Sequence, residues 1–383
     1  MRVLFLQHGL GYGGATKSMF IMQQALYPRA EIYTIIKRNK RINKVLSKEF
    51  IYSKEIKEID IPMIYSYSEG TISLNQFEKN KGYYPHEIID FIKENKIDIL
   101  HINSSVFSHI LKAIKEKTKC KIVVHVREML PYGMENKIDA YIIENTLKYA
   151  DKIIAISPNE LKVFKSVEKT YVLPNPHDFS VTDAFINEDE EHKVIRIGMC
   201  ANFIPIKGHL VFIKAIKLIN AKTENKAVEF RIIGYPKKEN SLRGLIKWFI
   251  SKSYKRQVDT LINKFSITNL KLVPFTFEPL KEINKLDIYI RPDLSGNPWG
   301  RDIIEAMALK KPIIATGTSD FYIVENSNGF LIEPGNAEQL AGRILKLIAD
   351  KELRERMGNN GYKLAVEKCN MIDYSLQLMK IYL

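Results

Sequence analysis

Residues 287–317 read DIYIRPDLSGNPWGRDIIEAMALKKPIIATG. The stretch begins with a short apolar run, DIYIRP, and ends with a second one, KPIIATG. Between them, a loop containing Gly296, Pro298 and Gly300 leads into the helical segment 302–310. A strand, a helix and a second strand in this order predict two parallel strands joined by a crossover helix. This segment therefore predicts an α/β protein with a parallel sheet.

The alternation of strands and helices continues on both sides of this segment. In the amino-terminal half, strands are predicted at 2–8, 31–37, 97–104, 121–128 and 151–157, with helices at 16–26, 86–96, 107–117 and 139–150. The pattern restarts with strands at 194–200, 228–234, 270–275, 287–292 and 311–317, and helices at 209–219, 257–267, 279–286, 302–310 and 337–350. Strands that alternate with helices in this way are typical of doubly wound parallel sheets.

The domain boundary is expected at NEDEEH (187–192), a polar, acidic stretch without apolar periodicity. We therefore expect two Rossmann-like domains, 1–186 and 187–370, that face each other across a cleft. A final helix, 371–383, is expected to pack back on the first domain. Because ligands of such sheets bind at the carboxyl ends of the strands, the cleft is the expected site.

Composition restricts the class of protein. The chain has 383 residues, 45% of them hydrophobic, which fits two globular domains. Its three cysteines, Cys120, Cys200 and Cys369, lie far apart and form no CxxC motif. They indicate a reducing compartment and argue against structural zinc. The apolar run at the start is too short for a signal peptide, and no run approaches a membrane span, so we expect a cytoplasmic protein.

The net charge of +14 favours anionic partners. Nucleic acid, an anionic membrane surface and phosphorylated ligands all meet this condition. Nucleic-acid binding would require a recognisable module or a basic groove with interleaved aromatic residues, and the sequence contains neither. No nucleic-acid partner is therefore expected.

The first loop contains Gly9, Gly11 and Gly14 in a GxGxxG spacing between a strand and a helix. This spacing is typical of dinucleotide-binding loops. The acidic residue that would bind the ribose is missing, because Lys37 and Arg38 occupy the corresponding region. This disfavours NAD and leaves NADP open. Alternatively, the glycines only form a tight turn, or they let a substrate approach the backbone.

Five segments of the second half occur in a characteristic order: GMCANFIPIKGHLVFIKAI (198–216), FRIIGYP (230–236), VPFTFEPL (273–280), SGNPWGRDIIEAMALKK (295–311) and KPIIATGTSDFYIVENSNGFLIEPG (311–335). Together they resemble the retaining GT-B glycosyltransferases of the family 4 type, the glycosyl transferases group 1. In the first half, GYGGATKS (11–18), ILHINSS (99–105), VVHVRE (123–128) and VLPNPHD (172–178) agree with this resemblance. It implies an enzyme that transfers a sugar from a nucleoside-diphosphate donor to a hydroxyl group.

The segment around Gly300 offers a site for the diphosphate of such a donor. The glycine allows a ligand to approach, and the helix that begins near Arg301 has unpaired N–H groups and a positive dipole end. The resemblance places Glu305, one turn further, at the ribose hydroxyls. The alternative is that Glu305 is a solvated helix residue paired with Arg301 at i−4.

Lys207 is the expected cation beside the leaving diphosphate. A fixed positive charge there would stabilise the negative charge that develops on the β-phosphate. The sequence has no Asp-x-Asp on a plausible loop that would hold a divalent metal for this task, so we expect no metal ion and no other cofactor. The alternative is an ordinary surface lysine.

The remaining expected donor contacts follow from the resemblance. Gly234 ends a strand near the donor, and the segment Phe275–Thr276 lies at the base. Two positions depart from the family pattern. Asn297 replaces a Glu that contacts the donor sugar, and Asn202 replaces an Arg beside the phosphates, for which Arg301 would compensate.

In the first domain the resemblance implies an acceptor site near Gly13 and Gly14. His125, at the end of a predicted strand, corresponds to a family His close to the reacting sugar, and Arg127 follows it. The alternative for His125 is a buried histidine whose hydrogen bonds are satisfied by the backbone.

Two basic segments suggest where the protein works. KKENSLRGLIKWFISKSYKR (237–256) combines apolar residues with seven Lys or Arg, and KRNKRINKVLSK (37–48) forms a second cluster. The first suits an amphipathic segment on an anionic membrane, or else an ordinary surface helix. We therefore expect a lipid-linked or surface-polysaccharide acceptor in a bacterium, with peripheral attachment to the inner face of the plasma membrane.

Three other functions remain open at this point. The two asparagines, Asn202 and Asn297, are compatible with a catalytically weak protein that only binds a sugar nucleotide. A sugar-nucleotide epimerase has the same two-domain architecture. An NADP oxidoreductase would use the glycine loop.

Overall fold

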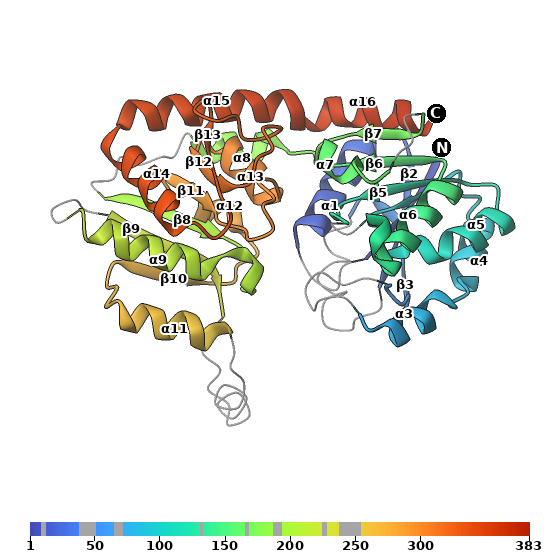
Figure 1. The fold of residues 1–383 in the computed structure, drawn as a ribbon. Helices are drawn as coiled ribbons and strands as arrows, with labels where there is room; N and C mark the ends of the chain where they lie inside the picture. Colours follow the sequence, from blue (N-terminus) through green and yellow to red (C-terminus); the bar gives the residue numbers. More distant parts are fainter. Residues whose placement is uncertain are drawn as a thin grey trace. The chain divides into compact units, whose positions relative to one another are not determined.

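A computed structural model describes residues 1–8, 13–37, 51–64, 72–130, 133–164, 168–186, 194–223, 228–236 and 254–383. The chain divides into two compact units. The N-terminal unit comprises Met1–His177 and Cys369–Leu383, and the C-terminal unit comprises Asp178–Lys368. Figure 1 shows the fold of each unit, coloured along the sequence.

The N-terminal unit is built on a seven-stranded parallel sheet in the order β3-β2-β1-β4-β5-β6-β7. Its strands are β1 (Arg2–Gln7), β2 (Glu31–Lys37), β3 (Ser53–Ile59), β4 (Ile99–Ile102), β5 (Lys121–Val126), β6 (Lys152–Ala155) and β7 (Thr170–Val172). Its helices are α1 (Gly14–Leu26), α3 (Leu74–Lys81), α4 (His86–Glu94), α5 (Leu111–Lys117), α6 (Lys137–Tyr149), α7 (Pro158–Leu161) and α16 (Met371–Tyr382).

Helices cover both faces of this sheet, so its central strands are buried on both sides. In β1, Val3 and Phe5 join an apolar cluster with residues of α1 and α16, whereas Leu4 and Leu6 join a cluster that includes residues of α4, α5 and α6. Successive side chains of a strand point to opposite faces, and this explains the continuous apolar run of RVLFLQ.

The C-terminal unit contains a six-stranded parallel sheet in the order β10-β9-β8-β11-β12-β13. Its strands are β8 (Ile195–Cys200), β9 (Val228–Tyr235), β10 (Leu270–Pro274), β11 (Ile288–Arg291), β12 (Ile313–Thr316) and β13 (Gly329–Ile332). Its helices are α8 (Phe179–Ile186), α9 (His209–Asn220), α11 (Tyr254–Lys264), α12 (Pro279–Asn284), α13 (Arg301–Ala308), α14 (Ala337–Ala349) and α15 (Lys351–Cys369). Two doubly wound parallel sheets confirm the expected fold class.

The units divide the chain at slightly different residues from those expected at 186/187 and 370/371. Helix α8 is part of the C-terminal unit because it contacts α12 and α13, and Asn284 Nδ2 donates a hydrogen bond to the carbonyl of Phe185 at 3.3 Å. The expected linker, 187–192, lies outside the described residues. Helix α16 contacts α1 within the N-terminal unit.

In each sheet, the first strand in the sequence lies in the middle, and this creates a topological switch point. The chain runs from β1 to one side and later returns to place β4 on its other side; β8 and β11 are related in the same way. Loops that leave the carboxyl ends of such strand pairs diverge and leave room for a ligand. The site should therefore be sought after β8 and β11, and after β1 and β4.

Two helical glycines of the C-terminal unit predict opposite effects of alanine. A Cβ on Gly358 of α15 would lie 1.9 Å from the carbonyl oxygen of Lys310, whereas a Cβ on Gly342 of α14 would meet no atom within 4 Å. We expect Gly358→Ala to destabilise the unit by about 1–3 kcal/mol through overpacking. Gly342→Ala should stabilise it by about 0.5–1 kcal/mol through higher helix propensity. Thermal unfolding of the two variants beside the parent chain tests this, and a lower melting temperature for Gly342→Ala than for Gly358→Ala would contradict it.

Candidate donor site and acceptor site

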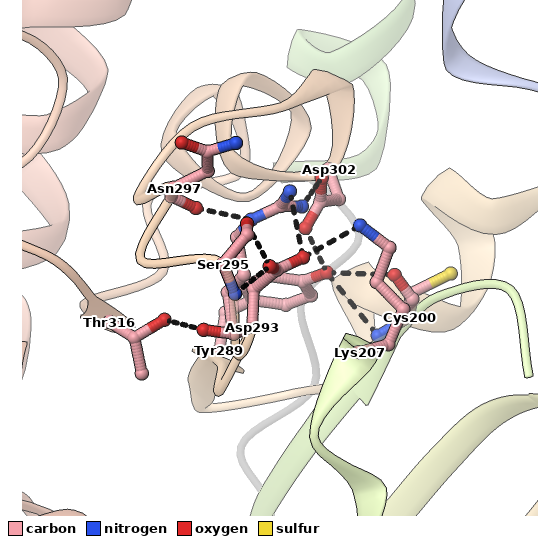
Figure 2. Close-up of polar contacts among 9 residues, drawn as sticks. Cys200, Lys207, Tyr289, Asp293, Ser295, Asn297, Asp302 and Thr316 are labelled. Carbon is pink, nitrogen blue, oxygen red and sulfur yellow. Dashed lines mark hydrogen bonds and ion pairs between the residues drawn. The ribbon is translucent and has the colours of Figure 1, made fainter. Parts of the chain in front are cut away.

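Lys207 and Asp293 form a salt bridge at the switch point of the C-terminal sheet. Lys207 ends the short helical turn Pro205–Lys207 after β8, and Asp293 follows β11. The Lys207 Nζ lies 2.7 Å from Asp293 Oδ2. Figure 2 marks this contact with a dashed line. The Asp293 side chain is only 2% exposed, whereas that of Lys207 is 25% exposed. The carboxylate therefore fixes a lysine that solvent, or a ligand, can still reach.

The two loops that carry this pair are also joined through their backbones. The N–H of Leu294 donates to the carbonyl of Ile206 at 2.7 Å. Gly208, with φ of +74°, brings its Cα so close to Pro292 that a Cβ would lie 1.8 Å from the Pro292 carbonyl oxygen. Only glycine tolerates this contact and this left-handed conformation. The KG pair of the sequence is therefore a structural requirement of the close loop packing.

Asp293 receives further hydrogen bonds that hold it in place. The N–H of Ser295 donates to Asp293 Oδ1 at 2.9 Å, the Ser295 hydroxyl donates to the same oxygen, and Thr316 Oγ1 donates to the Asp293 carbonyl. Burial would raise the pKa of the Asp293 carboxyl, but the positive charges of Lys207 and Arg291 outweigh it and leave that pKa below its usual value. Asp293 is thus ionised near neutral pH.

Arg291 connects the end of β11 to the start of α13. Its Nη1 lies 2.5 Å from Asp302 Oδ1, its Nη2 lies 3.5 Å from Asp293 Oδ2, and its Nε donates to the carbonyl of Asn297 at 3.1 Å. Tyr289 donates a hydrogen bond from its hydroxyl to Asp302 Oδ2 at 2.9 Å. Figure 2 includes both residues of this contact. The polar cluster therefore fixes the loop 293–300 and the first turn of α13 relative to the strand.

Helix α13 begins at Arg301, directly after Gly300, as the sequence predicts. Gly300 is extended, and a Cβ there would lie 2.5 Å from Asp302 Oδ1 and 2.7 Å from Arg291 Nη1. The helix can start immediately after the loop because glycine leaves room for this partly buried ion pair. Asn297 is half-buried and uses its carbonyl, not its side chain, to accept from Arg291.

The Arg301–Glu305 pair that the sequence offers as an alternative is present, but it is buried. Arg301 Nε donates to Glu305 Oε1 at 3.2 Å, and the side chains are 6% and 3% exposed. Glu305 is therefore not a solvated helix residue. Its ribose-binding role and the phosphate-binding role of Arg301 stay predictions.

The other expected donor residues lie near the carboxyl ends of the neighbouring strands. Asn202 is exposed in the loop after β8. Gly234 has φ of +100° and lies so close to the start of that loop that a Cβ on it would be 2.3 Å from the carbonyl oxygen of Ala201. Phe275 and Thr276 follow β10, two strands from β8. Phe275 is 52% exposed and contacts the exposed Phe277 edge to face, with ring centroids 5.1 Å apart. Exposed aromatic rings of this kind suit stacking on a base.

In the N-terminal unit, polar side chains gather at the carboxyl ends of β4 and β5. Arg127 Nε donates to Asn103 Oδ1 at 2.8 Å, and Arg127 Nη1 donates to Asn175 Oδ1. Glu128 is 5% exposed and accepts from the N–H and hydroxyl of Ser105 at 3.2 Å and 3.0 Å. Arg127 is thus fixed within the cluster.

Gly13 and Gly14 lie at the start of α1, after β1. Gly13 is the N-cap, where an added Cβ would meet no atom within 4 Å, and Gly14 is exposed. Gly9 and Gly11 of the GxGxxG spacing lie outside the described residues, so the dinucleotide interpretation of that loop stays untested.

His125 is fully buried within β5, and its Nε2 has no hydrogen-bond partner in the described part of the chain. Burial lowers its pKa well below the usual 6.5, and the nearby Arg127 lowers it further. His125 is therefore neutral. The catalytic role of His125 stays a prediction. The alternative, in which the backbone satisfies its hydrogen bonds, does not apply, because its Nδ1 lies 3.3 Å from Nε2 of His101.

Four residues that hold this candidate site together were not among those expected from the sequence: Tyr289, Arg291, Asp293 and Asp302. Arg291 and Asp293 come directly after the apolar run of β11, and charged residues at the carboxyl end of a buried strand were the available signal. Their partners could not be inferred, because Lys207 lies 86 residues from Asp293.

The remaining expectations concern metals and membranes. No three His, Cys, Asp or Glu residues in the described ranges are grouped so that they could hold a metal ion. The basic segment 237–256 is described only from Tyr254, and 37–48 only at Lys37, so both lie essentially outside the described residues. Within the described helices, none combines the length and the apolarity needed to cross a bilayer.

Comparison with known proteins shows a similarity to glycosyltransferases. The sequence model of the glycosyl transferases group 1 matches residues 182–364. The capsular polysaccharide biosynthesis glycosyltransferase CapM of Staphylococcus aureus is 28% identical over 47% of this chain and 45% of its own length. The poly(ribitol-phosphate) alpha-N-acetylglucosaminyltransferase of Staphylococcus aureus (strain COL) is 24% identical over 78% of this chain and 57% of its own length. The matches thus span about half the length of these two relatives.

Solved structures confirm the architecture. HepE of Anabaena, solved in complex with UDP, has a TM-score of 0.78 and 18% identity, and the match covers 99% of both chains. Staphylococcus aureus TarM, solved with fondaparinux, alpha-GlcNAc-glycerol and UDP, has a TM-score of 0.73 and 15% identity over 100% of this chain and 99% of its own. The chain therefore has the GT-B fold, and its residues 182–364 match the sequence model of the glycosyl transferases group 1.

Proposed function

We propose that the protein is a retaining glycosyltransferase that moves a sugar from a nucleoside-diphosphate sugar to a hydroxyl group of a lipid-linked or surface-polysaccharide acceptor. The observation that carries this proposal is Lys207, a cation fixed by a buried carboxylate at the switch point of the C-terminal sheet. The match of residues 182–364 to the sequence model of the glycosyl transferases group 1 supports the reaction class.

The chemistry of Lys207 fits the β-phosphate of the donor. An ammonium has three N–H donors, and the hydrogen bond to Asp293 uses one of them. The others can bind oxygens of a diphosphate while the ammonium stays in a fixed position. As the bond between sugar and phosphate breaks, negative charge grows on the diphosphate, and a preorganised cation stabilises that charge without reorganisation.

The start of α13 would supply the second contact to the diphosphate. The helix has eight residues, and its positive end lies directly after Gly300. Glu305 would accept hydrogen bonds from the ribose hydroxyls, and Phe275–Thr276 would contact the base. Asn297 would contact the donor sugar through neutral hydrogen bonds.

A uridine nucleotide is the first donor that we propose to test, because HepE has been solved with UDP and with UDP-glucose. The reaction would proceed by attack of the acceptor hydroxyl on the same face from which the diphosphate leaves. The leaving diphosphate would help to take up the hydroxyl proton, so that no protein nucleophile is required. Retention and this course of attack rest on the family resemblance.

The N-terminal unit would bind the acceptor near Gly13, Gly14, His125 and Arg127. The names of CapM and of the poly(ribitol-phosphate) transferase associate those relatives with cell-surface glycans, which supports an acceptor of that class here. The net charge of +14 supports contact with an anionic membrane surface at which such an acceptor is assembled.

Replacing Lys207 should abolish the response to the nucleotide. We expect at least one of UDP, GDP and ADP to raise the melting temperature of the parent chain, and Lys207→Met to lose this shift. Transfer from the matching sugar nucleotide should fall by about 10² to 10³-fold, the usual effect of removing one group that stabilises transition-state charge. Thermal shift and a transfer assay measure both effects.

Lys214, an exposed lysine of α9, is the matched control, and Lys214→Met should behave as the parent chain. In Lys207→Met alone, the Asp293 carboxylate loses its lysine partner. The double variant Lys207→Met/Asp293→Asn removes that negative charge as well, and it should show the same loss of nucleotide binding and transfer. A Lys207→Met chain that binds and transfers as well as Lys214→Met does would contradict the assignment.

Glu305 should distinguish a nucleoside diphosphate from inorganic diphosphate. Glu305→Gln removes the charge that accepts from the ribose, so we expect affinity for UDP to fall by about tenfold, the range of one hydrogen bond to a charged group. Affinity for inorganic diphosphate should stay unchanged. Calorimetric titration of both ligands tests this.

Glu325 provides the control, because it also pairs with an arginine, Arg343, at 2.9 Å in the same unit. Glu325→Gln should bind both ligands normally. Equal loss of UDP and inorganic diphosphate in Glu305→Gln would show that the substitution acts through the loss of the Arg301 pair, and the ribose assignment would then be wrong.

Metal removal provides an independent test of the Lys207 mechanism. Because a lysine and helix amides are proposed to stabilise the diphosphate, EDTA should leave the initial rate of transfer unchanged. A loss of activity that Mg²⁺ or Mn²⁺ restores would contradict a metal-independent mechanism.

A further inference from the structure

Three polar rings form a chain inside the N-terminal unit. Tyr382 of α16 places its hydroxyl 2.7 Å from His101 Nδ1, and His101 Nε2 lies 3.3 Å from His125 Nδ1. His101 is on β4 and His125 on the adjacent strand β5. The register pairs His101 with Val123, two residues before His125, so both rings point to the same face of the sheet.

The chain is buried from end to end. His101 and His125 are 0% exposed, and Tyr382 is 1% exposed. The surrounding cluster is apolar and includes Val3, Phe5 and Val123, and the Phe5 ring lies 5.0 Å from that of His101. Lys121 Nζ donates to the carbonyls of Tyr382 and Leu383 at 3.1 Å and 2.9 Å, which fixes the end of α16 against the sheet.

Both histidines are neutral in this environment. Burial lowers the pKa of His101 to about 3 and that of His125 well below 6.5, and the positive charge of Arg127 lowers both. Each ring therefore carries one N–H and one acceptor nitrogen. Only two arrangements of protons satisfy the two hydrogen bonds of the chain.

In the first arrangement the Tyr382 hydroxyl donates to His101 Nδ1, and His101 Nε2–H donates to His125 Nδ1. His125 then carries its proton on Nε2. In the second arrangement every proton is reversed, and His125 Nε2 is an acceptor.

The hydroxyl of Tyr382 decides between the two arrangements. In the described part of the chain, His101 is its sole hydrogen-bond partner. If the hydroxyl accepted, its own proton would be buried without an acceptor, which costs more than an unused lone pair. The hydroxyl therefore donates, and the first arrangement follows.

We propose that Tyr382 is a positioning residue that, through His101, holds His125 as the Nε2–H tautomer and thereby makes it a hydrogen-bond donor to an oxygen of the acceptor bound in the N-terminal unit. The surroundings of Nε2 of His125 agree with this proposal, because that nitrogen is buried and has no partner among the described residues. The identity of the ligand oxygen rests on the proposed function, whereas the tautomer does not.

The chemical consequence is a restriction on what His125 can do. A neutral ring with its proton on Nε2 donates to a hydroxyl or carbonyl oxygen, and it cannot take a proton at that nitrogen. His125 would thus orient and polarise a ligand oxygen but would not serve as a general base. A helix that joins the N-terminal unit from the far end of the sequence sets this property.

The experiment reads the tautomer directly from ring-¹⁵N-labelled histidine by long-range ¹H–¹⁵N NMR. Spectra of His101→Gln and His125→Gln assign the two rings. In the parent chain we expect both rings to carry their proton on Nε2, and to remain neutral down to at least pH 5. A proton on Nδ1 of either ring would overturn the proposal.

Tyr382→Phe removes the hydroxyl and keeps the aromatic ring. We expect His101 and His125 to lose their single tautomer and to show a mixture, with kcat reduced about three- to tenfold, the range of one hydrogen bond. The KM for the donor should stay unchanged, because the diphosphate site is in the other unit. Unchanged tautomers in Tyr382→Phe would overturn the proposal.

Tyr374→Phe is the matched control. Tyr374 is also on α16, is 2% exposed, and donates its hydroxyl to Met22 Sδ at 3.0 Å, outside the chain of rings. Its substitution should leave both tautomers and kcat as in the parent chain. If Tyr374→Phe changes the tautomers as much as Tyr382→Phe, the effect is one of packing and the positioning role is wrong.

The two proposals fail in distinguishable ways. If no donor supports transfer but the NMR result is as expected, the proposed function is wrong and the tautomer assignment stands. If transfer occurs and Tyr382→Phe changes the tautomers but not kcat, the positioning role is overturned and the proposed function stands.

Discussion

The salt bridge between Lys207 and Asp293 joins the loops that follow the two central strands of the C-terminal sheet. Everything proposed for the donor site depends on it, because a lysine on an isolated loop would have no fixed position. The close contact of Gly208 with Pro292 and the hydrogen bond from Leu294 to Ile206 hold the same loops together. A cation held in advance needs little reorganisation when charge develops beside it, and this is the physical basis of electrostatic catalysis.

The N-terminal unit fixes its polar groups without using charge. Burial makes a charged imidazole unfavourable, so His101 and His125 are neutral. What is fixed in this unit is the direction of their hydrogen bonds. In the C-terminal unit, by contrast, Arg291 and Lys207 keep the buried Asp293 ionised. The same sheet topology thus supports a fixed charge in one unit and a fixed tautomer in the other.

Some elements escaped prediction for identifiable reasons. Strand β3 reads SKEIKEI, in which two charged residues precede each isoleucine. It is an edge strand, where charged residues are common, but the segment lacks the apolar run of a central strand. Helix α15 contains GNNG at 358–361, which reads as a loop. Gly358 is present because the carbonyl of Lys310 lies where a side chain would be, a contact that the local sequence does not reveal.

The sequence by itself determined the order of most strands and helices, and from that order the two parallel sheets. It also placed Lys207 after a strand, Gly300 before a helix and Glu305 one turn into that helix, because apolar periodicity and glycines are local signals. Only the tertiary structure decided which ends become neighbours. Asp293 lies 86 residues from Lys207, and Tyr382 lies 281 residues from His101. Such pairs depend on strand order, register and the docking of α16, and these arise from packing between distant segments that no local pattern encodes.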